Sequence, residues 1–295
     1  MISSPNMKET EIISQQEKKE ISLKAKVLIL GLFDKEEIIS ITTDKRKIPN
    51  LELDKNSKEK WQEILISNPR AFIGKLYKVC NWDLNNGKII LELGETDYRE
   101  YVGSRDVSDL RNYGFEYLSN PLGVSTVLIT KDNKLIISKK LSGDATGSID
   151  TIGGFVSPEE DTVNGKVDIF HTAVREIAEE LNFQNVNQIN SHLSNMTCIG
   201  LAYEYSSFCH INAMFAANID LDASEIEPRI SYEIKPIAVN LNKQSPTLEE
   251  TLKSFYPNIE PDGRVVMALV KEFTKRKNSG DNFYPKRLLR TRLEV

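Results

Sequence analysis

The segment DIFHTAVREIAEELNF, residues 168–183, constrains the fold more than any other part of the chain. Its apolar side chains recur at helical spacing and, at about 100° per residue, form one stripe about 100° wide. The members of this stripe are Phe170, Ala173, Val174, Ile177 and Leu181. Glu176, Glu179 and Glu180 fall together on the adjacent face, because residues three and four apart lie side by side on a helix. The segment therefore predicts a helix that buries one face in a core and presents three carboxylates beside it.

The three carboxylates on one face of this helix lower its stability unless a positive charge lies nearby. Neighbouring carboxylates repel one another by roughly a few tenths of a kcal/mol per pair. Arg175 can reach Glu179 along the helix, but one guanidinium does not neutralise three carboxylates. A hard divalent cation would, because Mg²⁺ favours carboxylate oxygens and keeps waters that a phosphate substrate can replace. A merely solvated glutamate face is the alternative interpretation.

Strand-like segments lie on both sides of the acidic helix. Runs rich in Ile, Val and Leu occupy residues 124–141, 196–205, 210–219 and 233–241, and the first contains a turn at Asp132-Asn133. A further amphipathic helix is expected at residues 263–276, before a basic tail. Strands on both sides of one central helix predict an α/β sandwich rather than a strictly alternating sheet.

A smaller unit precedes this part of the chain. Two strands are expected at residues 23–33 and 36–43, then a helix through residues 58–67 capped by Asn56 or Ser57. Residues 71–94 resemble a hairpin that turns at Asn85-Asn86-Gly87, where Asn-Gly suits positive φ. We expect a flexible leader at 1–22, an α+β domain at 23–117 and the α/β domain at 118–295.

Composition limits the classes of function. Lys and Arg number 38 and Asp and Glu 43, so the net charge of −5 is a poor match for the basic field of a nucleic-acid binder. No apolar run approaches the roughly 18–20 residues that cross a bilayer, and the N-terminal segment lacks the apolar core of a secretory signal. Three scattered cysteines without a CxxC pair suit a reducing cytosol. We expect a cytoplasmic protein that binds neither nucleic acid nor membrane; its oligomeric state stays open.

The sequence around the acidic helix resembles the Nudix box, the signature of the Nudix hydrolase superfamily. That signature reads G-x5-E-x7-R-E-U-x-E-E-x-G-U, with U an apolar residue, and the chain follows it from Gly154 through Glu160 to Arg175–Phe183. Fourteen residues separate Glu160 from Arg175 instead of seven, about one extra hairpin. A longer surface loop costs only about 0.6 kcal/mol per doubling, so the box can tolerate it. Asn182 replaces a glycine that ends the helix in a left-handed conformation, which Asn tolerates next best.

The resemblance implies a Nudix α/β/α sandwich, preceded here by the small α+β domain. Glu160 would pair with Arg175 and tie the loop to the helix, and Gly154 would begin the box. Glycines at this point let the backbone approach a metal or phosphate closely. Mg²⁺, or Mn²⁺ in its place, would be held by oxygens of the helix and of the glycine strand: Glu176, Glu179, Glu180 and the carbonyl of Gly153.

A narrower resemblance covers residues 95–215. The motifs Tyr98–Gly103, Asn120–Val124 and Gly147–Gly154 are similar to those of the UDP-glucose diphosphatase branch of Nudix enzymes in animals and plants. It implies cleavage of UDP-glucose to UMP and glucose 1-phosphate with Mg²⁺. Past residue 200 the match is weak, so base and sugar specificity stay open. One alternative substrate is another nucleoside diphosphate derivative, such as ADP-ribose. The alternative function is nucleotide binding without turnover.

Several residues are candidates for substrate contact. Tyr98, Arg99 and Tyr101 offer aromatic and polar groups for a nucleotide, although packing at a domain junction is an equal alternative. Lys139 and Lys140 could contact phosphate, but alternation along a strand lets only one of them face the site. Asp150 precedes the glycines, where a hydrogen bond that stabilises a turn is the alternative role.

The proposed chemistry needs a general base to activate water. Glu180 or Glu176 is the first choice, because both lie on the acidic helix face. Glu233, in the distal segment SYEIKP, is a further candidate, because such bases vary within the family.

Overall fold

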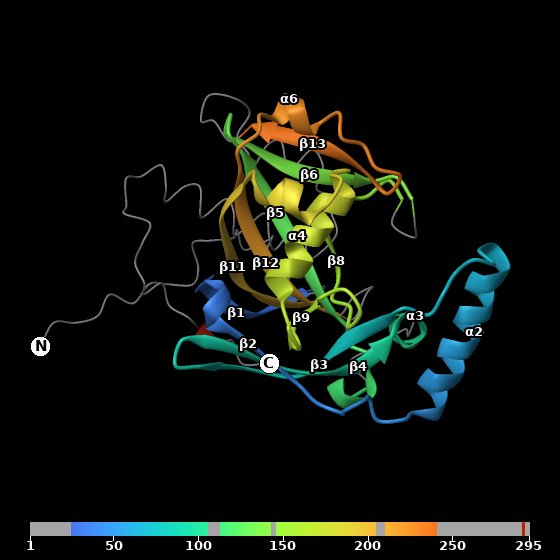
Figure 1. Ribbon diagram of the computed structural model, residues 1–295. Coiled ribbons are helices and arrows are strands. Elements are labelled where there is room, and N and C mark those ends of the chain that lie inside the picture. The colour runs from blue at the N-terminus through green and yellow to red at the C-terminus, as the bar shows by residue number, and fades with distance from the viewer. Residues whose placement is uncertain (1–24, 106–112, 143–145, 205–209, 241–290, 293–295) are drawn as a thin grey trace, which may run out of the picture.

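The computed structural model describes residues 25–105, 113–142, 146–204, 210–240 and 291–292 (Figure 1). The predicted leader (1–22) and the predicted helix at 263–276 lie outside the described residues, and of the tail that follows only Thr291–Arg292 is described. Strands precede and follow helix α4 (Ile169–Glu180) along the chain, which confirms the α/β class.

Among the described residues, nine strands form one mixed sheet. Its main path runs through β13 (Ile234–Asn240), β6 (Lys134–Lys140), β5 (Leu122–Thr130), β12 (His210–Ile219), β11 (Leu193–Glu204), β1 (Ala25–Phe33) and β14 (Thr291–Arg292). Off this path, β7 (Ile149–Asp150) pairs with β6 and β8 (Ile152–Phe155) with β5. The pair β5–β12 is parallel and the others are antiparallel. Strands from before and after α4 thus lie side by side, and a crossover that contains the helix connects them.

Helix α4 packs on β8 and β5, as Figure 1 shows. The side chain of Asp168 caps it by accepting hydrogen bonds from N–H groups of its first turn. The predicted apolar stripe is confirmed, since each of its five side chains is at most 8 % exposed. Asn182, just after the helix, has a φ of 52°, the left-handed conformation predicted there. Two short helices, α5 (Val186–Asn190) and α6 (Ala223–Ile226), follow.

A three-stranded sheet forms from the residues before β5, in the order β2 (Ile38–Thr42), β4 (Lys88–Asp97) and β3 (Lys75–Asn85). The hairpin of β3 and β4 confirms the prediction for residues 71–94. Its turn uses Asn86 and Gly87 at φ values of 49° and 75°.

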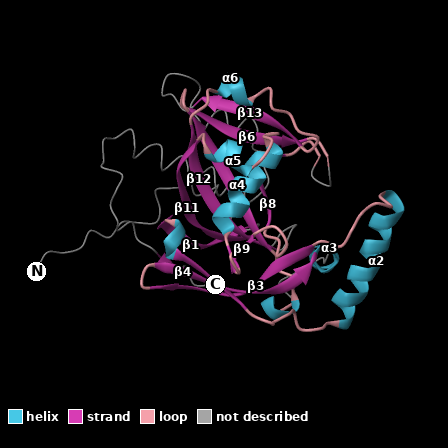
Figure 2. Cartoon of the chain, in the orientation of Figure 1, coloured by secondary structure: helices cyan, strands magenta, loops and turns pink. Residues whose placement is uncertain are grey.

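Helix α2 (Leu51–Ser67) corrects the sequence prediction at its start. Asn50, not Asn56 or Ser57, is the cap, because its side chain accepts hydrogen bonds from the N–H groups of Glu52 and Leu53. Helix α3 (Tyr98–Arg105) packs against α2 (Figure 2), and the 3-10 turns η2 (Lys35–Glu37) and η4 (Phe115–Tyr117) complete this region. In the part of the chain that the structure describes, no helix combines the length and the hydropathy that a membrane span requires.

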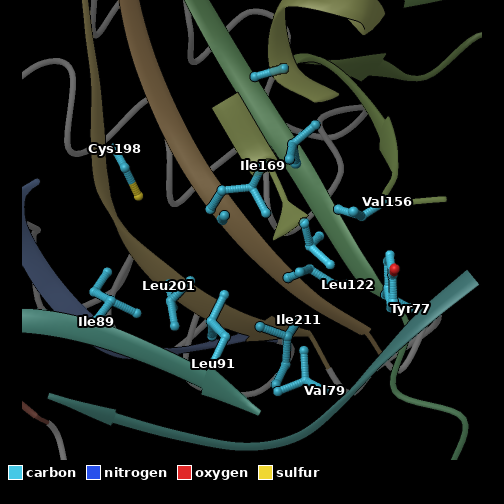
Figure 3. Packing of buried hydrophobic residues seen from close by; sticks show 14 of the residues in the cluster. Tyr77, Val79, Ile89, Leu91, Leu122, Val156, Ile169, Cys198, Leu201 and Ile211 are labelled. Atoms are coloured by element: carbon cyan, nitrogen blue, oxygen red, sulfur yellow. The ribbon is translucent and has the colours of Figure 1, made fainter. Parts of the chain in front are cut away.

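One hydrophobic cluster joins the two sheets (Figure 3). Ile89 and Leu91 of β4 lie in it with Leu201 of β11 and Ile211 of β12, and none of the four is exposed. Strand β1, which the sequence places with the first unit, pairs with β11 in the large sheet. Strands β1 and β4 and helix α4 therefore contribute side chains to one core.

Candidate active site

The two glycines of β8 bring backbone and carboxylate together. β8 pairs with β5, with Gly153 opposite Ser125 and Gly154 opposite Val124. A Cβ on Gly153 would lie 2.0 Å from the carbonyl oxygen of Val124, and one on Gly154 would lie 2.4 Å from Cδ of Glu176. The absence of both side chains therefore lets the strand lie close to β5 and lets the Glu176 carboxylate rest on the strand.

The loop from β8 to α4 contains the extra hairpin that the sequence spacing predicted. It consists of β9 (Thr162–Val163) and β10 (Lys166–Val167) and turns through Asn164 and Gly165, whose φ values are 52° and 74°. The Thr162 hydroxyl lies 2.9 Å from the hydroxyl of Tyr77 on β3. The added residues thus contact the three-stranded sheet and leave the box helix in place.

Arg175 lies at the centre of the box, and it makes two parallel hydrogen bonds to a residue that the sequence analysis did not single out, Asp161. Nε and Nη2 donate to the two carboxylate oxygens of Asp161, each at 3.1 Å, and Nη2 also donates to the carbonyl oxygen of Phe155 at 3.2 Å. The predicted partner Glu160 is 3.7 Å from Nη1, with its side chain 57 % exposed, whereas that of Asp161 is fully buried. The motif spacing predicted Glu160 as the partner of Arg175. In the structure the partner is the buried acid beside it, Asp161, and spacing alone gives no information about burial.

Each of the three helix glutamates contacts a basic side chain. Glu176 and Glu179 share Nη1 of Arg175, at 2.9 and 3.1 Å, and Oε1 of Glu180 lies 3.2 Å from Nζ of Lys140. The side chain of Glu180 is 2 % exposed and that of Glu179 is 55 % exposed. Within the described ranges, no three acidic, histidine or cysteine side chains already form a metal-binding group. The carboxylates are close together but are turned toward cations of the protein itself.

Burial changes the protonation of two of these acids. Burial, together with the nearby charges of Glu179 and Glu180, raises the pKa of Glu176 to about 8, against the attraction of Arg175. Burial raises the pKa of Glu180 to about 7, against the attraction and hydrogen bond of Lys140. Both groups therefore sit where negative charge is poorly solvated.

The chemistry of these donors fits a hard divalent cation. Oε2 of Glu180 is buried and has no hydrogen-bond partner among the described residues, so one oxygen remains able to accept a ligand. Carboxylate and carbonyl oxygens are the ligands that Mg²⁺ and Mn²⁺ prefer. A bound cation would also offset the cost of charging two buried carboxylates.

These pKa values predict how stability depends on pH. Both carboxyls bind protons more tightly in the folded than in the unfolded protein, so the free energy of unfolding falls as pH rises from about 4.5 to about 8. We expect the Tm of protein treated with chelator to fall across this range, and Mg²⁺ to raise Tm more at pH 8 than at pH 5. The double variant Glu176→Gln/Glu180→Gln is the control, in which this part of the pH dependence disappears. An equal slope in wild type and double variant would contradict the assignment.

Of the two lysines on β6, Lys140 faces the site through Glu180, and Lys139 is exposed. This agrees with the expected alternation. The carboxylate of Asp150 accepts a hydrogen bond from the N–H of Thr151 at 2.7 Å, which is the turn-stabilising contact weighed against substrate binding. Lys140 is thus the lysine that the fold brings to the glutamates.

Glu233 lies just before β13, and its charge raises the pKa of Glu180. Its backbone carbonyl accepts a hydrogen bond from the N–H of Leu141 at 2.7 Å, which holds it at the end of β6. The hydroxyl of Tyr232 donates to the Glu233 carboxylate, and the Tyr232 side chain is 81 % exposed. Tyr232 was not a sequence candidate; it precedes β13, which pairs with β6, and the pKa of its hydroxyl is raised by the hydrogen bond to Glu233 and, to a smaller extent, by the charge of Glu179 on α4.

The three candidates on α3 differ in accessibility. Tyr101 is 3 % exposed and packs on Phe155, with ring centroids 4.9 Å apart, and on Tyr98 at 5.7 Å. Tyr98 is half-buried, and Arg99 pairs with Asp97 at 3.4 Å. Tyr101 therefore supports the end of the glycine strand by packing, while Tyr98 and Arg99 retain accessible surface.

A glycine strand, an arginine-centred loop and a helix with three glutamates, all on a mixed sheet, are the features that the resemblance to the Nudix box predicted for this part of the chain. No protein-family model matches the chain. The chain is 24 % identical over 195 residues to the human uridine diphosphate glucose pyrophosphatase NUDT22. This match covers 56 % of this chain and 63 % of the human protein. It is 25 % identical over 228 residues to the mouse protein of that name, covering 67 % and 72 %. The chain thus spans less than two thirds of the length of its human relative.

Among solved structures, a MutT protein from Methanosarcina mazei Go1 is 19 % identical, with a TM-score of 0.36. The match covers 55 % of this chain and 98 % of that one. The sequence resemblance to Nudix proteins of the UDP-glucose diphosphatase type is confirmed by the two curated relatives.

Proposed function

We propose that this chain is a divalent-metal-dependent Nudix pyrophosphohydrolase that cleaves UDP-glucose, or a close UDP-sugar, to UMP and glucose 1-phosphate. The observation that carries the proposal is the complete glutamate face of α4, with Glu176 and Glu180 buried beside the glycine strand. The similarity to the human and mouse uridine diphosphate glucose pyrophosphatases supports the substrate class. The reaction adds one water across the phosphoric anhydride, and the bridging oxygen leaves with one of the two phosphoryl groups.

The residues that would hold Mg²⁺ or Mn²⁺ are those of the predicted box: Glu176, Glu179, Glu180 and the carbonyl of Gly153. When bound, such an ion neutralises charge on a diphosphate and makes water more acidic. Lys140 lies beside Glu180 and is placed to contact a phosphate oxygen once that carboxylate has another cation.

Glu180 is our first choice for the group that takes the proton from water. Its Oε2 atom is buried and has no hydrogen-bond partner among the described residues, so this oxygen can accept a proton. Glu176 is an alternative on the same face. Glu233 is exposed and its charge raises the pKa of Glu180, which supports it as a further candidate for accepting the proton.

A nucleotide panel tests the function. Purified protein with Mg²⁺ or Mn²⁺ is incubated with UDP-glucose, another UDP-sugar, ADP-ribose and a dinucleotide, and the products are separated by chromatography. We expect UMP and glucose 1-phosphate from UDP-glucose, and no product in chelator. Turnover of ADP-ribose or the dinucleotide alone would keep the reaction type and reject the substrate. Nucleotide binding without turnover of any substrate would favour a binding module.

The nucleoside end of the substrate is assigned to Tyr98 and Arg99, the accessible residues of α3. A uracil ring needs an aromatic face, so Tyr98→Ala is expected to raise KM for UDP-glucose about tenfold with kcat nearly unchanged. Steady-state kinetics measures both constants. Tyr232→Ala is the matched comparison, because its exposed ring lies on the β13 side of the glutamates. A rise in KM in Tyr232→Ala alone would move the nucleoside to that side.

A further inference from the structure

We propose that Asp161, the residue after the box glutamate, is the positioning residue that holds Arg175 and thereby keeps the glutamates of α4 available to a metal ion. The kinetic part of this inference rests on the proposed function, and the metal-binding part does not. In the resemblance this role falls to Glu160, which the structure leaves at the surface.

The contacts of the two acids with Arg175 differ in kind. Asp161 makes two parallel hydrogen bonds of 3.1 Å to Nε and Nη2, and its side chain is fully buried. Paired charge-assisted bonds of this geometry are strong and fix the orientation of a guanidinium. Glu160 makes one 3.7 Å contact from an exposed side chain, the type of ion pair that contributes little.

Asp161 is itself held on several sides. Its Oδ2 accepts a hydrogen bond from the N–H of Ser157 at 2.8 Å, and its own N–H donates to the carbonyl of Ser157 at 2.9 Å. Its carbonyl accepts from the N–H of Asp168, the cap of α4, at 2.9 Å. One residue thus joins the turn after β8, the start of α4 and the guanidinium of Arg175.

This arrangement decides which part of Arg175 meets the glutamates. The Nε and Nη2 edge faces Asp161, and Nη2 also donates to Phe155, so Nη1 alone contacts Glu176 and Glu179. Without the Asp161 charge, the guanidinium is free to turn a second nitrogen toward these carboxylates. It would then compete with a divalent cation for the same oxygens.

The hairpin insertion gives a reason for the change of partner. β9 begins directly after Asp161, and its Thr162 contacts Tyr77 of the three-stranded sheet. The chain bends at Asp161, and its short side chain reaches Arg175 directly. The longer Glu160 side chain, one residue earlier, points to the surface.

Metal affinity tests the inference on the full chain. Mn²⁺ is titrated by calorimetry into wild type, Asp161→Asn and Glu160→Gln, and Tm is recorded for each. We expect Asp161→Asn to weaken Mn²⁺ binding at least tenfold and Glu160→Gln to change it less than twofold. With the nucleotide sugar that the enzyme hydrolyses as substrate, and at saturating metal, Asp161→Asn should lower kcat more than it changes KM. Equal affinities in Asp161→Asn and wild type, or a tenfold loss in Glu160→Gln, would overturn the assignment.

A second comparison covers the case in which Asp161→Asn does not fold, because that change leaves a buried guanidinium without its main partner. The variant Arg175→Met removes the arginine alone. The double variant Asp161→Asn/Arg175→Met removes both charges. If Asp161 acts through Arg175, the two variants bind Mn²⁺ with affinities within twofold of each other. A further tenfold loss in the double variant would show that Asp161 acts by another route and would overturn the proposal. Because Mn²⁺ affinity needs no turnover, these outcomes stay separate from a failure of the nucleotide panel.

Discussion

Glu180→Gln is expected to lower kcat for UDP-glucose about 1,000-fold while the protein stays folded and still binds nucleotide. The change keeps the shape of a side chain that is 2 % exposed, but it removes the proton acceptor and a charged oxygen ligand. Loss of a general base costs about 10²–10⁴-fold, so the expected effect is well above assay error. Single-turnover kinetics and calorimetry with UDP measure the two halves of the prediction.

Glu159→Gln is the matched control, because Glu159 is an exposed glutamate of the loop between β8 and α4. It should leave kcat and KM at wild-type values. Full activity in Glu180→Gln would reject the assigned role and direct attention to Glu176 or Glu233. Loss of nucleotide binding together with a fall in Tm would show instead that the side chain is needed for folding.

Alanine at each of the two glycines of β8 should separate stability from activity. In Gly154→Ala the new Cβ would meet the Glu176 carboxyl at 2.4 Å, so the carboxylate has to move. Misplacement of a reacting group by about 1 Å can cost 10²-fold, and we expect kcat to fall about 100-fold. In Gly153→Ala the Cβ would meet the backbone of β5 at 2.0 Å, which a side-chain rotation cannot relieve. Overpacking of this kind costs about 1–3 kcal/mol of stability.

Chemical denaturation and steady-state kinetics on both variants test this separation. Gly147→Ala is not a suitable control, because a φ of 90° strains any side chain there. Gly74→Ala is suitable, since the nearest atom to its Cβ would be 3.4 Å away, on the Phe72 ring. If Gly154→Ala keeps full activity, the Glu176 carboxylate has no fixed position in the reaction.

Local features of the fold were predictable because they depend on neighbouring residues. The apolar stripe of α4 follows from helical spacing, and the turn at Asn86-Gly87 follows from the need for positive φ. The extra hairpin before α4 follows from counting residues between Glu160 and Arg175. The first residue of α2 was mispredicted, since Asn50, Asn56 and Ser57 are all acceptable caps and only the observed hydrogen bonds choose between them.

The candidate site was predictable in composition but not in its contacts. Box spacing identified Glu176, Glu179 and Glu180, and it named Glu160 as the partner of Arg175. It could not show that Asp161 is the buried acid, because two adjacent acids look alike in a motif. Tyr101 was a candidate for substrate contact with packing as an equal alternative, and its ring is buried against Phe155 of β8.

By itself the sequence determined that one helix carries an apolar stripe and a glutamate face and that two glycines precede it. It also determined that the loop from the glycines to the helix is long. These properties depend only on residue type and spacing. The tertiary structure decided that β1 joins the large sheet, that Lys140 rather than Lys139 meets Glu180, and that Asp161 holds Arg175. Each of these depends on which distant segments pack together and on which polar atoms that packing removes from water, and no local pattern contains that information.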